Sequence, residues 1–238
     1  MNYSKLILSV INRLKPLEPI NSKKVYKEKF ANIIPEGTYY KILERMTKAN
    51  KIERIGKGIY CIPKKTEFGT ITNCCENIVK EYTKNNSGML VDYKMYFEKK
   101  LTTQVAKKIC IFSNDVDFDK RTFNNVVILK KDIEFNEINK SIIRIFEVLE
   151  NYNKIEEFNK ANFSKMLFKY LEDFNDEAVQ KVLEKIKYKK RTIAFLKEIL
   201  DVNKKDNSLN NYLSNLSKYE IPYEEIKDAF TFEQRYIQ

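Results

Sequence analysis

The 238-residue sequence contains no histidine and only four cysteines. Without histidine, no Ser/His or Cys/His nucleophile pair can form, and the commonest general base of enzymes is missing. Enzymes remain possible only with carboxylate, lysine or tyrosine chemistry, and we expect that this protein is not an enzyme. The cysteines lack the spacing of a zinc site, so we expect buried, reduced thiols and neither a metal nor a cofactor. They are Cys61, Cys74, Cys75 and Cys110.

Long apolar runs, glycine and proline are also scarce. No apolar run approaches the ~20 residues that a membrane span needs, and the N-terminus has an amphipathic pattern instead of a cleavable leader. We therefore expect a cytoplasmic protein with no membrane partner. The five glycines and five prolines, together with 43% hydrophobic and 32% charged residues, indicate a folded and mostly helical chain.

Positive charge is concentrated at the N-terminus. The net charge is +11, and residues 1–65 hold 15 Lys and Arg against five Glu, whereas the other 173 residues hold 29 basic and 28 acidic side chains. A chain that only needs solubility can spread its charge, so this concentration indicates a polyanionic partner. We expect that partner to be double-stranded DNA.

The pattern of residues 1–65 predicts three helices and a hairpin. The first helix is expected to be capped by Ser4 and ended by Pro16, and two more are expected at residues 22–31 and 35–49. Residues 52–62 contain two β-prone segments joined through Gly56, Lys57 and Gly58. This order is the outline of a winged helix-turn-helix DNA-binding domain.

The third expected helix carries two separate stripes of side chains. At 100° per residue, its apolar residues gather on one side, as a core-facing stripe requires. These residues are Tyr39, Ile42, Leu43 and Met46. A second stripe can reach phosphates and base edges in a major groove. It consists of Thr38, Lys41, Arg45 and Lys48.

Ten residues are predicted to bind DNA. They are Lys23, Lys24, Lys27, Thr38, Tyr40, Lys41, Arg45, Lys48, Arg54 and Lys57. The alternative interpretation of such a stripe is an ordinary solvated helix face. We favour DNA because the charge is confined to one unit, the helices are suitably spaced and the glycine-tipped hairpin is basic. In addition, Glu44 is the only acid of the third helix beyond its first turn.

The remaining chain predicts two further domains. The composition shifts to near neutrality after residue 65, so we expect a domain boundary there. Residues 66–152 then predict a mixed α/β domain. Its helices are expected at 70–82, 91–100 and 138–151, a turn at 85–88, and strands at 107–112 and 125–129. Residues 153–238 predict a helical bundle, with weaker helices at 209–216 and 223–230. The expected fold class is α+β, mainly α.

Two stretches of the sequence carry a family resemblance. Residues 43–60 read LERMTKANKIERIGKGIY, in which a leucine-bearing helix leads into a basic strand and a Gly-x-Gly-Ile-Tyr wing. Farther on, Ser87 and Gly88 are followed by LTTQV at residues 101–105 and ICIF at residues 109–112. Together, over roughly residues 1–150, these motifs resemble the AbiEi-type antitoxins, the transcriptional-regulator halves of type IV toxin-antitoxin systems.

The resemblance implies a role in abortive infection, an antiviral defence. It implies that the chain represses its own operon by binding inverted repeats in the promoter. It also implies that the chain counteracts a cognate nucleotidyltransferase toxin, without the need for a stable complex. Thr102, Thr103 and Gln104 lie in the second motif, where the alternative interpretation is a polar turn that caps a strand.

Other functions remain open from the sequence. A Mg²⁺-dependent nuclease could use Asp92, Glu98 and Lys100, but that site needs Glu and Lys on one strand, and a helix at 91–100 splays them about 160° apart. Residues 115–119 contain three alternate aspartates, yet Lys120 and Val126 stand where a calcium loop needs glycine and glutamate. A winged-helix replication or mobile-element DNA-binding protein is the third possibility.

Overall fold

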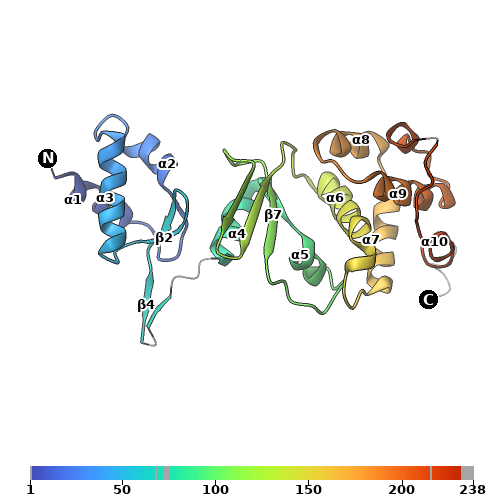
Figure 1. Cartoon of the computed structure of the whole chain (residues 1–238), viewed down its shortest axis with the longest axis horizontal. Helices are drawn as coiled ribbons and strands as arrows, with labels where there is room; N and C mark the ends of the chain where they lie inside the picture. The colour runs from blue at the N-terminus through green and yellow to red at the C-terminus, as the bar shows by residue number, and fades with distance from the viewer. Residues whose placement is uncertain (1, 68, 72–74, 215, 232–238) are drawn as a thin grey trace. The chain divides into compact units, whose positions relative to one another are not determined.

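The computed structural model of the chain describes residues 2–67, 69–71, 75–214 and 216–231 (Figure 1). It is a mixed α/β structure with about 51% helix and 15% strand, which confirms the expected mixed and mainly helical class. The chain divides into two compact units. Unit 1 contains Met1–Tyr82 and Arg121–Val126, and unit 2 contains Thr83–Lys120 and Val127–Gln238. The three-domain division with boundaries at residues 65 and 152 stays a prediction.

Unit 1 begins with three helical segments around a small sheet. In chain order its elements are α1 (Tyr3–Ile11), β1 (Ile20–Asn21), α2 (Ser22–Val25), a π-helical turn (Tyr26–Phe30), α3 (Glu36–Lys48), β2 (Glu53–Gly56) and β3 (Ile59–Cys61). The antiparallel sheet has the order β1-β3-β2, with Tyr60 of β3 between Ile20 and Arg54. The expected helices and the hairpin are therefore present, whereas the two-residue strand β1 was not predicted.

Asparagine side chains begin the first two helices. The Oδ1 atom of Asn2 accepts a hydrogen bond from the Lys5 amide at 3.2 Å, so the cap of α1 is Asn2 and the prediction of Ser4 was wrong. Asn21 caps α2 in the same way through the Lys24 amide, at 3.1 Å. An N-cap side chain satisfies a backbone N–H that the helix itself cannot pair, which fixes where each helix starts.

One apolar core holds these elements together. The four apolar residues of α3 are all buried, as predicted, because they face α1, the π-helical turn and β3. The buried members of this core are Ile7, Ile11, Ile20, Phe30, Ile34, Tyr39, Ile42, Leu43, Met46, Ile52 and Tyr60. The opposite face of α3 therefore remains available to solvent.

The segment after residue 63 differs from its prediction. Lys64–Thr66 (β4) and Gly69–Ile71 (β5) pair as an antiparallel hairpin, and helix α4 runs over Cys75–Thr83. The predicted start of this helix at residue 70 was therefore wrong, because Thr70 and Ile71 belong to the strand β5. Thr70 and Ile71 are extended because they pair with β4. The helical spacing of apolar residues in the sequence carries no information about this pairing. Residues 72–74, including Cys74, lie outside the described residues.

A second sheet is built from four strands in the order β6-β7-β9-β8. They are Gly88–Val91, Ile109–Ser113, Val126–Lys130 and Lys120–Phe123, respectively. β6 and β7 pair antiparallel with Gly88 opposite Ser113. The expected turn at 85–88 is a short 3-10 helix at Lys84–Asn86 (η2), and Gly88 already belongs to β6. The strands expected at 107–112 and 125–129 are present with shifted bounds.

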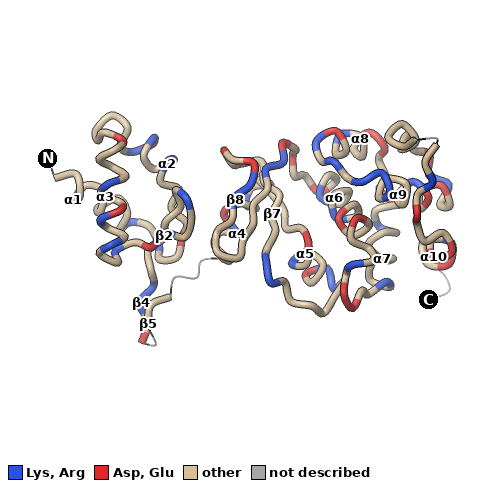
Figure 2. The backbone as a smooth tube through the Cα atoms, viewed as in Figure 1, with Lys and Arg blue, Asp and Glu red and all other residues tan. Residues whose placement is uncertain are grey.

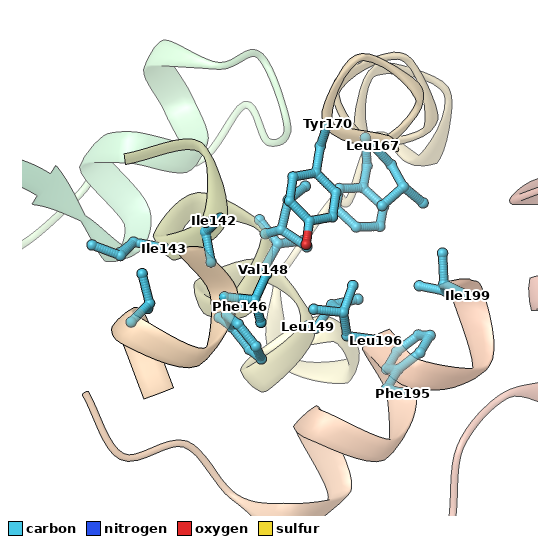
Figure 3. Packing of buried hydrophobic residues seen from close by; sticks show 14 of the residues in the cluster. Ile142, Ile143, Phe146, Val148, Leu149, Leu167, Tyr170, Phe195, Leu196 and Ile199 are labelled. Carbon is cyan, nitrogen blue, oxygen red and sulfur yellow. The ribbon is translucent and has the colours of Figure 1, made fainter. Parts of the chain in front are cut away.

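Apart from β6, β7 and most of β9, the elements of unit 2 are helices. They are α5 (Asp92–Glu98), α6 (Glu137–Glu150), α7 (Lys160–Glu172), α8 (Asp176–Lys185), α9 (Lys190–Val202) and α10 (Tyr223–Ala229), with short 3-10 helices η3 (Tyr152–Lys154) and η4 (Leu209–Tyr212). Among the described residues of 209–216, the expected helix is represented by the shorter η4. In the core, Phe146 and Leu149 of α6 lie near Leu167 of α7 and Leu196 of α9 (Figure 3). This single core extends from Met89 to Phe230 in the sequence.

Candidate nucleic-acid interface

Helix α3 presents one row of polar and cationic side chains. Lys41, Arg45 and Lys48 are exposed and Thr38 is half-buried, as expected for a stripe that faces away from the core. Figure 2 marks the basic positions of α3 in blue along the backbone. At 1.5 Å per residue, the row from Thr38 to Lys48 is about 15 Å long. It can therefore follow several phosphates or base edges along one groove.

One acid interrupts this row. The carboxylate of Glu44 lies 2.8 Å from the ammonium group of Lys48, and both side chains are largely exposed. The hydrogen bond from Lys48 lowers the pKa of Glu44, so the acid is ionised at neutral pH. Ion pairs at such exposed positions are weak, and a phosphate group can compete with Glu44 for Lys48.

A hollow lies beside the row. It has a volume of about 690 Å³, and its walls come from the start of α1 and the exposed side of α3. The lining residues are Asn2, Tyr3, Ser4, Thr38, Lys41, Ile42 and Arg45. Polar side chains and two cations thus border a recess large enough for part of a nucleic-acid backbone. The sequence analysis placed Ser4 at the start of the first helix but did not indicate that Asn2 and Ser4 border this recess.

The remaining helical candidates lie on α2 and its continuation. Lys23, Lys24 and Lys27 are exposed, so they form a second cationic surface of unit 1. Tyr40 is half-buried, and its ring centroid lies 5.3 Å from that of Tyr39 in an edge-to-face arrangement. Its ring therefore contributes to packing at the edge of the core as well as to the surface.

The β2–β3 turn is fixed from two sides. Gly58 has a φ of 76°, a conformation that side chains disfavour. Its carbonyl oxygen accepts hydrogen bonds from the amide and the hydroxyl of Ser22, at 2.9 and 2.8 Å. On the other strand, Nε of Arg54 donates to the Gly56 carbonyl oxygen at 3.3 Å. Lys57 is exposed at the tip of this turn, and Arg54 is exposed beside it.

Sequence reasoning missed a second segment at this turn. Arg121, in the part of unit 1 that follows residue 120, donates a hydrogen bond from Nη1 to the Lys57 carbonyl oxygen at 3.3 Å. The two residues are 64 positions apart in the sequence. No local pattern carries information about such a contact, so only the tertiary structure reveals it.

The residues of the nuclease alternative point to different surroundings. Glu98 forms an ion pair with Lys94 at 3.5 Å, while Asp92 lies 3.6 Å from the Cys110 sulfur. Lys100 follows the end of α5 with a φ of 57°. Glu98 and Lys100 are therefore not on a strand, which is the arrangement that this metal site needs. Within the described ranges, no group of three potential metal-ligating side chains is found.

The cysteines that the structure describes are largely shielded. Cys61 and Cys75 are buried and Cys110 is half-buried. Burial and the neighbouring Asp92 raise the pKa of the Cys110 thiol to about 11, so it is protonated at neutral pH. A protonated thiol is a poor nucleophile and a poor metal ligand.

The sequence analysis also did not predict that Glu147 and Glu150 of unit 2 have shifted pKa values. Burial raises the pKa of Glu147 to about 7, and the nearby carboxylates of Asp92 and Glu150 act in the same direction. Glu150 behaves differently: burial opposes its ionisation, but hydrogen bonds from Lys189 and Thr192 lower its pKa. Both residues lie on α6, where the amphipathic pattern alone gives no sign of this difference.

Comparisons with known proteins add little to this geometry. No protein-family model matches the chain, and no curated protein matches it. Among solved structures, the chain is similar to the RV2827C protein from Mycobacterium tuberculosis, with a TM-score of 0.40 and 10% sequence identity over 81% of this chain and 74% of that one. A likeness of this size does not define a family. None of the described helices is both long and apolar enough to cross a membrane.

Proposed function

We propose that this chain is a DNA-binding transcriptional regulator whose residues 1–65 form a winged helix-turn-helix. The observation that carries the proposal is the exposed row of Lys41, Arg45 and Lys48, which lies opposite the buried face of α3. A recognition helix needs both faces, one packed in the core and one free to enter a major groove.

The order of elements supports this assignment. Helix α1, strand β1, helices α2 and α3, and strands β2 and β3 follow one another, and the sheet has the order β1-β3-β2. In a winged helix, a recognition helix is followed by a hairpin whose turn contacts the neighbouring groove or backbone. Here the hairpin after α3 ends in the exposed Lys57.

The finer proposal is that the chain is the antitoxin of a type IV toxin-antitoxin system. It then represses its own operon through promoter inverted repeats and counteracts a nucleotidyltransferase toxin, acting in the cytoplasm without catalysis of its own. This part rests on the AbiEi resemblance of residues 43–60 and 87–112. A nucleotidyltransferase gene beside this one would support it, and direct repeats at a replication origin would favour the initiator alternative.

A salt-dependent binding assay tests the DNA-binding proposal. The probe is a duplex from upstream of the chain's own gene, and the affinities of the full-length protein and of a Lys41→Gln, Arg45→Gln, Lys48→Gln variant are measured at several salt concentrations. Each phosphate contact contributes roughly −0.9 to the slope of log K against log salt, so we expect a steep slope for the wild type. We expect the triple variant to lose binding to the duplex.

A matched control separates specific contacts from total charge. Lys165→Gln, Lys181→Gln, Lys227→Gln removes the same charge from exposed positions of unit 2 and should retain most of the affinity. Circular dichroism checks that each variant is folded. A salt-independent wild type, or equal losses in both triple variants, would refute the role of α3. Co-expression with the neighbouring nucleotidyltransferase tests the antitoxin role separately, through relief of growth arrest.

A further inference from the structure

Strands β4 and β5 form a ribbon that lies outside the core of unit 1. They make a sheet of two strands, with Lys65 opposite Thr70 and Lys64 opposite Ile71. The described residues of the ribbon are exposed except for the half-buried Thr66, and none of them belongs to a hydrophobic core. Figure 1 shows the ribbon extending away from helices α1 to α3. An isolated two-stranded ribbon is only marginally stable in water, so a bound partner would stabilise this one.

The polar side chains of this ribbon are suited to a polyanion. Lys64 and Lys65 are both exposed, and Glu67 is the one acid among the described ribbon residues. Figure 2 marks basic positions of β4 in blue. Thr70 adds an exposed hydroxyl group opposite Lys65. Lysine and threonine side chains are common hydrogen-bond donors to phosphate oxygens, so the charge of the ribbon is complementary to a nucleic-acid backbone.

The two lysines lie on opposite faces of the ribbon, because successive side chains of a strand alternate. Lys65 shares its face with Thr70, and Lys64 shares the other face with Ile71. A sheet with its side chains is about 10 Å thick and the major groove of B-DNA is about 12 Å wide, so a two-stranded ribbon can enter the groove. When a ribbon enters edge-on, each of its faces lies beside one phosphate backbone. One lysine can then reach each backbone.

The ribbon also continues the proposed DNA-binding surface along the chain. Strand β4 begins three residues after the end of β3, whose turn with β2 carries the exposed Lys57. We propose that the β4–β5 ribbon is a second DNA-contacting element of unit 1, in which Lys64 and Lys65 bind phosphates on the two sides of one groove. The inference rests on the proposed DNA-binding function and adds residues 64–71 to its surface.

Protection of the free strand edges is the alternative role for these lysines. An exposed edge can pair with another chain, and lysine side chains on the edge hinder such pairing. In that role, replacement of both lysines by glutamine promotes self-association and leaves the affinity for DNA unchanged. Phosphate binding predicts a weaker salt dependence of DNA binding instead, because the salt slope counts phosphate contacts.

The experiment measures binding of the full-length protein to the upstream duplex and to a duplex of scrambled sequence at several salt concentrations. We expect Lys64→Gln, Lys65→Gln to lower the magnitude of the slope of log K against log salt by about 1.8, twice the contribution of one phosphate contact. The affinity should fall roughly tenfold for both duplexes, because phosphate contacts carry no sequence information. Lys64→Arg, Lys65→Arg keeps both charges and should keep the wild-type slope.

A matched control removes the same charge elsewhere. Lys165→Gln, Lys181→Gln changes exposed positions of α7 and α8 and should leave the slope unchanged. Circular dichroism checks folding, and binding is measured at concentrations at which light scattering shows the same particle size for every variant. A wild-type slope in the glutamine variant of the ribbon would overturn the inference. So would an equal loss of slope in its arginine variant or in the control.

The triple α3 variant, measured in parallel, separates this inference from the proposed function. If the α3 variant loses binding while the glutamine variant of the ribbon keeps the wild-type affinity and slope, only the role of the ribbon fails. Absence of duplex binding by the wild type removes the proposed function and this inference together.

Discussion

The Thr102 hydroxyl donates a hydrogen bond to the Glu156 carbonyl oxygen at 2.6 Å, and thereby links the loop after α5 to the loop before α7. The same hydroxyl oxygen accepts a hydrogen bond from the Gln104 amide at 3.2 Å, and the Gln104 side chain donates to Glu157. Thr102 and Gln104 of the LTTQV motif therefore organise a turn and join two loops of unit 2. The turn follows α5, and the hydrogen bonds of Thr102 and Gln104 go to the turn itself and to the loop before α7. The alternative interpretation from the sequence was a polar turn that caps a strand.

Replacement of Thr102 should destabilise the protein. Thr102→Val keeps the shape of the buried side chain but leaves two backbone groups without their partner, so we expect a loss of about 1–3 kcal/mol in the free energy of unfolding. Urea denaturation measures this loss. Thr103→Val is the control, because Thr103 is exposed, and it should change the stability by less than about 0.5 kcal/mol. Equal effects of the two substitutions would contradict the structural role of Thr102.

The stability of the fold should depend on the ionisation of Glu147. Its folded-state pKa of about 7 lies above the ordinary value of 4.5, so the folded protein holds this proton more tightly than the unfolded chain. The contribution of this group to stability is therefore present below pH 4.5 and is lost as the pH rises to about 7. Glu147→Gln, which does not titrate, should be more stable than the wild type at pH 8 by up to about 3 kcal/mol, and the difference should shrink towards pH 5.

Glu150 provides a control of opposite sign for that experiment. Its pKa is lowered in the folded state by hydrogen bonds from Lys189 and Thr192, so its ionised form stabilises the fold. Glu150→Gln should therefore be less stable than the wild type at pH 8, with a smaller deficit in acid. Denaturation curves at both pH values check the pair, and a Glu147→Gln advantage that does not vary with pH would rule out this ionisation as its cause.

Removal of the acid on α3 should strengthen DNA binding. Glu44 is exposed, forms an ion pair with Lys48 and adds negative charge between Lys41 and Arg45. Glu44→Gln frees Lys48 for a phosphate and removes repulsion, so we expect a roughly two- to fivefold increase in duplex affinity at low salt. Fluorescence anisotropy measures it, with Glu177→Gln on α8 as the control. An affinity that Glu44→Gln leaves unchanged, as in the control, would contradict the placement of α3 against the DNA.

The sequence by itself determined the two faces of α3. Its apolar residues repeat at the helical period, and burial of that face necessarily leaves Lys41, Arg45 and Lys48 outside. The sequence also predicted the hairpin of β2 and β3, because glycines at 56 and 58 mark a turn between two β-prone segments. The ionisation states of Glu147 and Glu150 could not be predicted, since they depend on neighbours that the fold brings together.

Only the tertiary structure decided what lies beside the turn at Lys57. Strand β1 is two residues long, too short for a periodic signal, and it exists because β3 pairs with it. The hydrogen bond of Arg121 and the packing of Phe123 on Gly56 join residues more than 60 positions apart. Local periodicity determines which face of an element is apolar, but contacts between distant segments depend on how the whole chain folds, and they place Arg121 at this turn.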